Sequence, residues 1–111
     1  MTKLDLSTMK IENNESAHRW EARIGEYVAF SEYRLNGDTD TIHFLKTRVP
    51  PDLEGQGVAG KLVSAALDDA RAQHLTVVPI CRFVTSYIRR HPEYRDLVYP
   101  DFRHLVEREQ S

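Results

Sequence analysis

The run Gly-Gln-Gly-Val-Ala-Gly-Lys at residues 55–61 constrains the fold more than any other segment of the chain. It satisfies two phosphate-binding patterns, G-x-G-x-x-G and G-x-x-x-x-G-K. In both patterns, glycines let consecutive backbone N–H groups crowd around an anion, and a following helix presents its positive N-terminus to the same anion. The segment therefore predicts a turn that leads into a helix and holds a phosphate-bearing ligand.

The residues before this glycine turn predict an antiparallel meander. Apolar and charged residues alternate over residues 19–24, which is the pattern of a half-buried strand. Residues 27–35 are rich in strand-forming side chains, and Asn36-Gly37-Asp38 favours a hairpin that returns through residues 41–49. Pro50-Pro51 should end the returning strand, because proline has no N–H to donate to a ladder.

The residues after the turn predict a helix, a buried strand and a second helix. Residues 58–73 carry apolar side chains at three- and four-residue spacing, so one stripe of this helix should face a core. Residues 76–80 form a short apolar run that is typical of a buried strand. A second helix is expected over residues 82–90, and His91-Pro92 should end it because proline disfavours helix in the residue before it.

The length of 111 residues favours a single domain over residues 1–111, with a core at about residues 11–98. Within it, residues 11–15 are interpreted as a polar lead-in to the first strand. The charged tail at residues 101–111 is expected to fray.

Composition disfavours several classes of partner. The formal net charge of −2 gives no overall attraction to nucleic acid or to an anionic membrane, and no run approaches the ~20 apolar residues of a membrane span. The N-terminus lacks the apolar run of a signal peptide, and the single cysteine suits a reducing compartment. We therefore predict a cytoplasmic protein. The histidines are scattered without H-x-x-x-H spacing or a paired cysteine, so no metal site is expected.

Neither phosphate-binding pattern fits its usual context. The second pattern needs Ser or Thr after the lysine to hold magnesium, but Leu62 stands there and cannot ligate a hard cation. The first pattern needs a strand that leads directly into the first glycine, and an acidic residue about 20 positions later to hold a ribose. Here residues 50–54 intervene, and residues 79–82 contain no carboxylate.

A third interpretation accommodates the whole order of elements and several short motifs. The motifs are Val49-Pro50-Pro51, the turn at residues 54–59, Leu67-Asp68-Asp69-Ala70-Arg71, Val78-Pro79-Ile80-Cys81, Phe83-Val84 and Arg89-Arg90-His91-Pro92-Glu93-Tyr94. With them, roughly residues 11–98 resemble the GNAT acetyltransferase superfamily, and especially a compact subfamily of small predicted N-acetyltransferases. The resemblance implies an α/β (α+β) fold: an antiparallel β-meander, a pyrophosphate loop, a helix, a parallel strand and a C-terminal helix.

The resemblance also implies that acetyl-CoA is the cosubstrate. Backbone N–H groups of the turn would bind the CoA pyrophosphate, and backbone groups of the preceding strand would pair with the pantetheine arm. The residues implied are Gly55, Gln56, Gly57, Val58 and Ala59 in the turn, Glu54 as the start of the loop, and Thr47 and Val49 in the strand. Glu54 stands where the superfamily usually has Gln or Arg. Lys46-Thr47-Arg48 stands where subfamily members often have His-Thr-Glu, so this segment offers cations in place of a general base.

Cys81 and Tyr87 are the candidate catalytic residues. Cys81 should lie at the start of the second helix beside Arg82, where the helix dipole and the cation would stabilise a thiolate able to accept an acetyl group. The alternative is a small buried side chain at a strand end. By the resemblance, Tyr87 would protonate the departing CoA thiolate. The alternative for Tyr87 is core packing beside Phe83 and Val84.

The sequence thus predicts an acetyl-CoA-dependent N-acetyltransferase that acts on a primary amine of a small molecule or a protein, directly or through Cys81. The alternative is a CoA- or acyl-CoA-binding sensor or interaction module without turnover, which the substitutions at Lys46, Arg48 and Glu54 keep open. A weaker alternative is a small structural protein in which the glycine turn only starts a helix. The chain is expected to be a monomer or a homodimer, because an open sheet edge could pair with a second copy.

Overall fold

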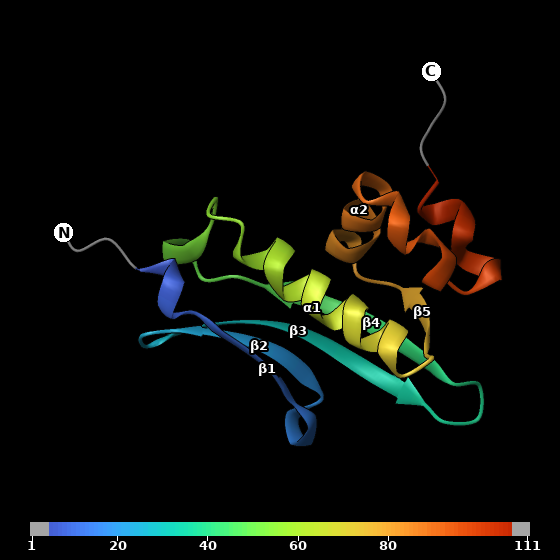
Figure 1. Ribbon diagram of the computed structural model, residues 1–111, viewed down its shortest axis with the longest axis horizontal. Coiled ribbons are helices and arrows are strands. Elements are labelled where there is room, and N and C mark those ends of the chain that lie inside the picture. The colour runs from blue at the N-terminus through green and yellow to red at the C-terminus, as the bar shows by residue number, and fades with distance from the viewer. Residues whose placement is uncertain (1–4, 108–111) are drawn as a thin grey trace.

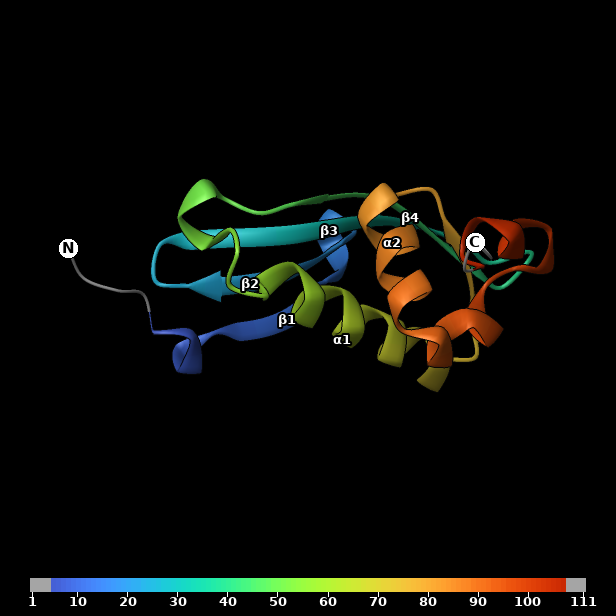
Figure 2. The same cartoon turned by 90° about the horizontal axis from the view of Figure 1, so that it is seen from above.

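The computed structural model describes residues 5–107, and its centre is a five-stranded mixed sheet with two α-helices on one face (Figures 1 and 2). The spatial order of the strands is β1-β2-β3-β4-β5. The strands are β1 (Lys10–Asn14), β2 (Arg19–Ile24), β3 (Tyr27–Asn36), β4 (Thr41–Arg48) and β5 (Thr76–Pro79). The helices are α1 (Val58–Ala72) and α2 (Arg82–Arg90). Short 3₁₀ segments are η1 (Leu6–Thr8), η2 (Glu15–Ala17), η3 (Pro51–Leu53), η4 (Pro92–Leu97) and η5 (Pro100–Leu105).

The topology confirms the predicted α/β fold. Strands β1 to β4 pair antiparallel, whereas β5 pairs parallel with β4 over Thr41–Phe44. Helix α1 makes the crossover between these two parallel strands, which places the glycine turn at the carboxyl end of β4. The backbone of α1 ends where His74 adopts a left-handed conformation and the Leu75 N–H donates to the Ala70 carbonyl.

The predicted polar lead-in is wrong, because residues 10–14 form the edge strand β1. Its residues pair with β2 in register, with Ile11 opposite Ala22 and Asn13 opposite Trp20. Only Ile11 adds an aliphatic side chain to the core, and Asn13 accepts a 2.7 Å hydrogen bond from the Tyr33 hydroxyl. One aliphatic residue in a polar segment is too weak a signal for a strand.

A β-bulge in β4 determines which side chains face the helices. Ser31 of β3 lies opposite Thr47, whereas Tyr33 lies opposite Phe44, so β4 holds one extra residue between these pairs. As a result Phe44 enters the core and Thr47 faces the same side, although an odd spacing normally puts two strand residues on opposite faces.

The apolar core has two clusters that meet at Trp20. The larger cluster lies between β3, β4, β5 and both α-helices, and the smaller lies between β2, η3 and the start of α1. Helix α1 belongs to both clusters, since its buried stripe is Val58, Leu62, Val63, Ala66, Leu67 and Ala70. This stripe is the one that the sequence pattern predicts.

The C-terminal segment differs from the expected frayed tail as far as the structure describes it. The Tyr99 N–H donates to the Val77 carbonyl at 2.8 Å, and Val98 makes a parallel bridge with Val77. Val106 is fully buried against the larger cluster, and Phe102 packs beside it. These two apolar residues are four apart in a charged segment, and both pack η5 against the core. Residues 108–111 lie outside the described residues.

Candidate active site

The segment after β4 is a tight turn that the two glycines allow. Gly55 and Gly57 have φ angles of 77° and 78°, which L-residues with a side chain rarely adopt. The Gln56 side chain donates a 2.9 Å hydrogen bond from Nε2 to the Asp52 carbonyl, which ties the turn to η3. Asp52 in turn accepts a hydrogen bond from the Tyr27 hydroxyl, and this bond raises the pKa of Tyr27.

The backbone N–H groups of this turn have no protein partner within the described part of the chain. Gly57 is the N-cap of α1 and carries no capping side chain. The first backbone hydrogen bond of the helix runs from the Lys61 N–H to the Gly57 carbonyl at 3.1 Å. Among residues 5–107, none of the N–H groups from Gly55 to Gly60 donates to an acceptor. Such a row of free donors at a helix N-terminus is suited to an anion.

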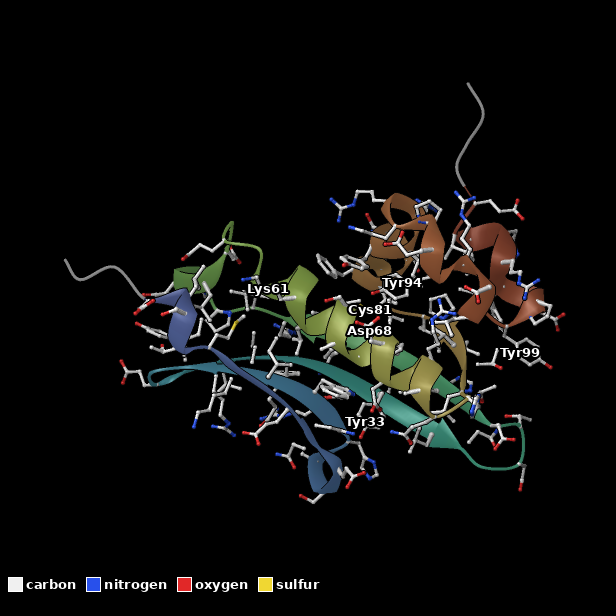
Figure 3. All side chains as sticks on the ribbon, in the orientation of Figure 1. Tyr33, Lys61, Asp68, Cys81, Tyr94 and Tyr99 are labelled. Carbon is white, nitrogen blue, oxygen red and sulfur yellow. The ribbon has the colours of Figure 1, made fainter. Side chains whose placement is uncertain are left out.

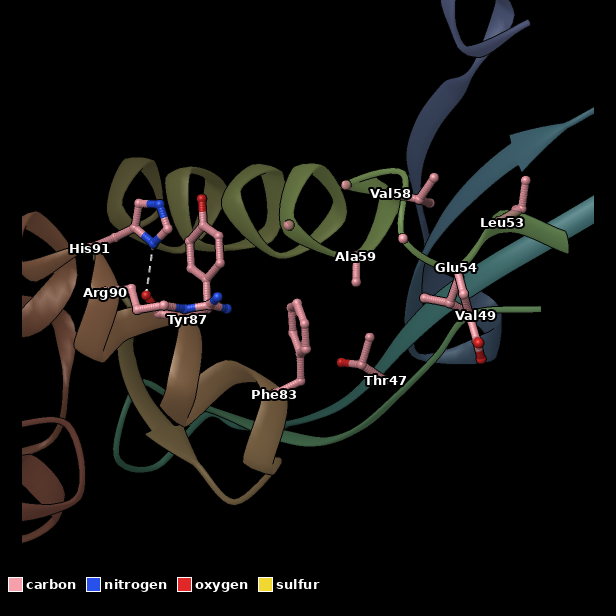
Figure 4. A pocket seen from close by; sticks show the side chains of 13 residues that line it. Thr47, Val49, Leu53, Glu54, Val58, Ala59, Phe83, Tyr87, Arg90 and His91 are labelled. Atoms are coloured by element: carbon pink, nitrogen blue, oxygen red, sulfur yellow. Dashed lines mark hydrogen bonds between the residues drawn. The ribbon is translucent and has the colours of Figure 1, made fainter. Parts of the chain in front are cut away.

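A cavity of about 550 Å³ lies between this turn, the end of β4 and one face of α2 (Figure 4). Its wall on the α2 side is a ladder of aromatic rings. Phe83 and Tyr87 have ring centroids 6.4 Å apart, and Tyr87 and His91 stack at 3.9 Å with an interplanar angle of 16°. The lining residues are Thr47, Val49, Leu53, Glu54, Gly55, Gly57, Val58, Ala59, Gly60, Phe83, Tyr87, Arg90 and His91.

Tyr87 is held in place by its ring and leaves its hydroxyl free. A Cβ atom at Gly60 would meet the Tyr87 Cε1 atom at 3.5 Å, so the ring lies against the first turn of α1. The His91 Nδ1–H donates to the Tyr87 carbonyl at 2.8 Å, which fixes the stacked pair. Among the described residues the Tyr87 hydroxyl has no hydrogen-bond partner, and it therefore stays available to a ligand.

Cys81 lies behind the cavity wall and is not one of its lining residues. It is the N-cap of α2, only 6% exposed, and its N–H donates to the Phe44 carbonyl at 2.8 Å. Its Sγ atom lies 3.4 Å from the Thr47 Oγ1 atom, which is also 3.0 Å from the Ser31 Oγ atom. The thiol is therefore one side chain away from the cavity, and Thr47 stands between them.

The end of β4 has an open edge beside the cavity. Strand β5 pairs with β4 only as far as Phe44 and Pro79, after which the chain turns at Cys81 into α2. Beyond Phe44, β4 therefore has no strand partner on the β5 side among the described residues. An extended ligand could use this edge, because free N–H and C=O groups of a strand end can pair with it.

One carboxylate stands among the lining residues. Glu54 is exposed, and Figure 4 shows its side chain directed away from the start of α1. Arg90 lines the opposite end of the cavity. An anion at the Gly57 turn would therefore not meet the Glu54 carboxylate directly.

Most of the predicted site residues meet at this cavity. Thr47, Val49, Glu54, Gly55, Gly57, Val58, Ala59 and Tyr87 all line it. Gln56 holds the turn from outside, and Cys81 lies behind Thr47. The sequence reasoning did not place His91, Arg90 or Phe83 at the site, and all three line the cavity. Their signal was the spacing of Phe83, Tyr87 and Arg90 along a single helix face.

No group of three or more His, Cys, Asp and Glu side chains in residues 5–107 is arranged to hold a metal ion. No helix in the same range is both long and apolar enough to cross a membrane.

The chain matches a model of a known protein family. The model described as GCN5-related N-acetyl-transferase matches residues 19–97 of the 111-residue sequence. The matched range begins at β2 and ends with η4, so it contains the glycine turn, the open edge of β4 and the aromatic face of α2.

Proposed function

The chain belongs to the GCN5-related N-acetyltransferase family and is an acyltransferase, and we propose that it moves an acetyl group from acetyl-CoA to a primary amine. The observation that carries the proposal is the row of N–H donors from Gly55 to Gly60, which have no acceptor within residues 5–107 and lie at one end of the cavity. A diphosphate there would receive hydrogen bonds from the backbone and face the N-terminus of α1.

The remaining parts of the cosubstrate would follow the cavity wall. The pantetheine arm would run along the open edge of β4 and pair with backbone groups around Thr47 and Val49. This orientation brings the thioester to the region between Thr47 and α2. The lining of the cavity supports this placement of acetyl-CoA, since it combines backbone N–H donors, Arg90 and apolar side chains with a single carboxylate.

In the proposed reaction the amine nitrogen attacks the thioester carbonyl carbon directly. As the tetrahedral intermediate breaks down, the C–S bond breaks, the nitrogen loses a proton to solvent, and the sulfur gains one. Tyr87 is the proposed donor of the sulfur's proton, because the residue lines the cavity and its hydroxyl has no partner among the described residues. The role of Thr47 is to hold the wall against which the thioester lies.

A route through Cys81 is the second version of this mechanism. The thiol would have to displace its contact with Thr47 and enter the cavity before it could accept the acetyl group. Replacement Cys81→Ser distinguishes the two routes. Full activity in this variant excludes the covalent route. Loss of activity in the variant, together with an acetylated Cys81 in the mass spectrum of the wild-type protein, supports that route.

A CoA-binding sensor without turnover is the second candidate function. The observation that favours it is the presence of Lys46 and Arg48 on either side of Thr47, since neither cation is a general base at neutral pH. Transfer assays with a broad amine panel decide between the two functions. Tight binding of acetyl-CoA with no thiol release above background would favour the sensor.

Thermal melting with acetyl-CoA tests the binding on which both candidates depend. A ligand at 100 times its Kd stabilises the folded state by about 2.7 kcal/mol, so the melting temperature should rise clearly. S-acetylpantetheine, which lacks the diphosphate, should give a much smaller shift. An unchanged melting temperature at millimolar acetyl-CoA would contradict the proposal.

A further inference from the structure

The two cations beside Thr47 point to the opposite face of the sheet from the cavity. Thr47 faces the helices, where its Oγ1 contacts Ser31 and Cys81. Lys46 and Arg48 alternate with it, and they lie opposite Glu32 and Phe30 of β3. In Figure 1 both α-helices lie on the upper side of the sheet, so neither covers the face that carries these two cations. This face is called the open face below.

The positive charge beside Thr47 on the open face is not neutralised within the described residues. Arg48 is exposed and takes part in no ion pair there. The Lys46 Nζ atom is 4.0 Å from a Glu32 carboxylate oxygen, and the two side chains are 53% and 36% exposed, so the pairing is weak.

The next carboxylate on this face belongs to Glu21, which is already paired with two arginines of its own strand. It is 1% exposed, and it accepts hydrogen bonds from Arg19 at 2.6 Å and from Arg23 at 2.9 Å. Across the open edge of β4, α2 begins with Arg82, which is exposed and has no ion-pair partner within residues 5–107.

An amine must reach the acetyl group at this edge, whichever face it comes from. The nearby cations are Lys46, Arg48 and Arg82 outside the cavity and Arg90 inside it, and they outnumber the nearby carboxylates, which are Glu54 in the cavity lining and Glu32 beside Lys46. These cations repel an ammonium ion, and they favour the neutral form of an amine, which is the form that attacks a thioester. The same field attracts a carboxylate or a phosphate. An acceptor with its own anionic group would therefore bind where a polyamine would not.

From these charges we propose that the acceptor carries an anionic group close to its reacting amine. An amino acid, an amine phosphate and an acidic protein N-terminus share this chemistry. Arg48 and Lys46 bind the anionic group from the open face, while the amine enters the edge beside Thr47. This inference rests on the proposed acetyl transfer and adds the class of acceptor. The transfer itself is unchanged: an N–C bond forms, the C–S bond breaks, and a proton moves from nitrogen to sulfur through solvent and Tyr87.

A matched set of small amines tests the inference. β-Alanine, β-alaninamide and 1,3-diaminopropane have similar size and carry an anionic, a neutral and a cationic group. At low ionic strength kcat/KM should be highest for β-alanine and lowest for the diamine, and about ten-fold or more should separate the extremes. Phosphoethanolamine and a short peptide with acidic residues after its free N-terminus distinguish a small-molecule acceptor from a protein N-terminus.

Charge reversal at the open face provides the second arm of the test. Lys46→Glu and Arg48→Glu should each lower the β-alanine to diamine ratio by about five-fold or more, without changing the melting shift that acetyl-CoA produces. Arg34→Glu is the control, because Arg34 is an exposed β3 residue opposite His43 and far along the sheet from Thr47. This variant should keep the wild-type ratio.

The outcomes separate the inference from the function on which it rests. Equal rates for the three amines, a preference for the diamine, or an equal effect of Arg34→Glu would overturn the inference alone. Binding of acetyl-CoA without transfer to any amine of the set would also overturn it and would favour the sensor. A protein that does not bind acetyl-CoA would overturn both proposals.

Discussion

Gly57 holds the proposed diphosphate site in a conformation that other residues resist. Its φ angle of 78° places it in the left-handed region at the N-cap of α1. Open space surrounds the position where a Cβ would stand, so the cost of a side chain there is conformational and not steric. A substitution at Gly57 therefore changes the direction of the N–H groups that follow it.

We expect Gly57→Ala to lower the free energy of unfolding by about 1 kcal/mol and to weaken acetyl-CoA binding as well. Gly25→Ala is the matched control, since Gly25 also has a positive φ, at 56°, and open space around it, but lies in the turn between β2 and β3. Chemical denaturation and titration calorimetry measure the two effects. The prediction fails if both variants bind acetyl-CoA with wild-type affinity.

Tyr87 should act on the rate and not on cosubstrate binding. Tyr87→Phe keeps the ring that stacks on His91 and removes only the hydroxyl. If that hydroxyl protonates the CoA sulfur, kcat should fall by about 100-fold, while the acetyl-CoA melting shift stays the same. Tyr94→Phe is the control, because the Tyr94 ring lies 6.1 Å from the Tyr87 ring but its hydroxyl donates to Asp68. A normal kcat in Tyr87→Phe would leave Tyr87 with a packing role only.

The residues that sequence reasoning found and missed differ in how local their signals are. The glycines of the turn and Tyr87 are identified by short motifs, and a motif of neighbouring residues can be recognised from the sequence alone. The place of Thr47 depends on the bulge in β4, which shifts the register against β3 by one residue. Strict alternation from Phe44 would have put Thr47 on the wrong face. Cys81 was predicted at the start of the second helix and lies there, but only packing shows that Thr47 separates it from the cavity.

Among the elements, those with a strong apolar period were predicted within about a residue. Helix α1 and helix α2 follow the three- and four-residue spacing of their buried stripes. Strand β1 and segment η5 were not recognised, because each contributes few apolar side chains to the core. Their position depends on contacts with other parts of the chain. Strand β2 pairs with β1, and the Tyr99 N–H donates a hydrogen bond to the Val77 carbonyl. A single-sequence pattern does not contain that information.

A hydrogen bond that joins segment η4 to α1 should be lost at alkaline pH. The Tyr94 hydroxyl donates to the Asp68 carboxylate at 2.8 Å, and Figure 3 shows the two side chains between α1 and the C-terminal segments. Burial and then this hydrogen bond raise the pKa of Tyr94 from 10.0 to about 12. The protonated phenol is therefore favoured in the folded state. Its stabilisation is fully present below pH 10 and is lost as the pH rises toward 12.

Tyr94→Phe should lower the free energy of unfolding by about 1–2 kcal/mol at pH 8, and this difference from the wild type should shrink above pH 10. Urea denaturation at pH 8, 10 and 11 measures the trend. Tyr99→Phe serves as the control, since the Tyr99 hydroxyl makes no hydrogen bond within the described residues. A difference that stays constant across this range would contradict the assignment.

Over the whole molecule, Trp20 joins the two core clusters. It packs against both, and it is the single tryptophan of the chain. Helix α1 contributes buried residues to both clusters as well, so neither cluster can open without exposing part of this helix. The two clusters should therefore unfold together.

We expect the urea transition followed by Trp20 fluorescence to coincide with the transition followed by far-ultraviolet circular dichroism. Trp20→Phe, which keeps an aromatic ring, should lower the midpoint and still give one transition by circular dichroism. Two separated transitions in the wild-type protein would show that the clusters are independent, contrary to this prediction.

The two faces of β4 have a consequence for the order of events in catalysis. Thr47 borders the cavity on the helix side of the sheet, while Lys46 and Arg48 lie on the open face. On the proposed assignments, donor and acceptor reach one strand from opposite directions and do not compete for one entrance. Either substrate could then arrive first, and a ternary complex could form without a lid. Steady-state kinetics should show intersecting double-reciprocal lines, and free CoA should compete with acetyl-CoA but not with the amine.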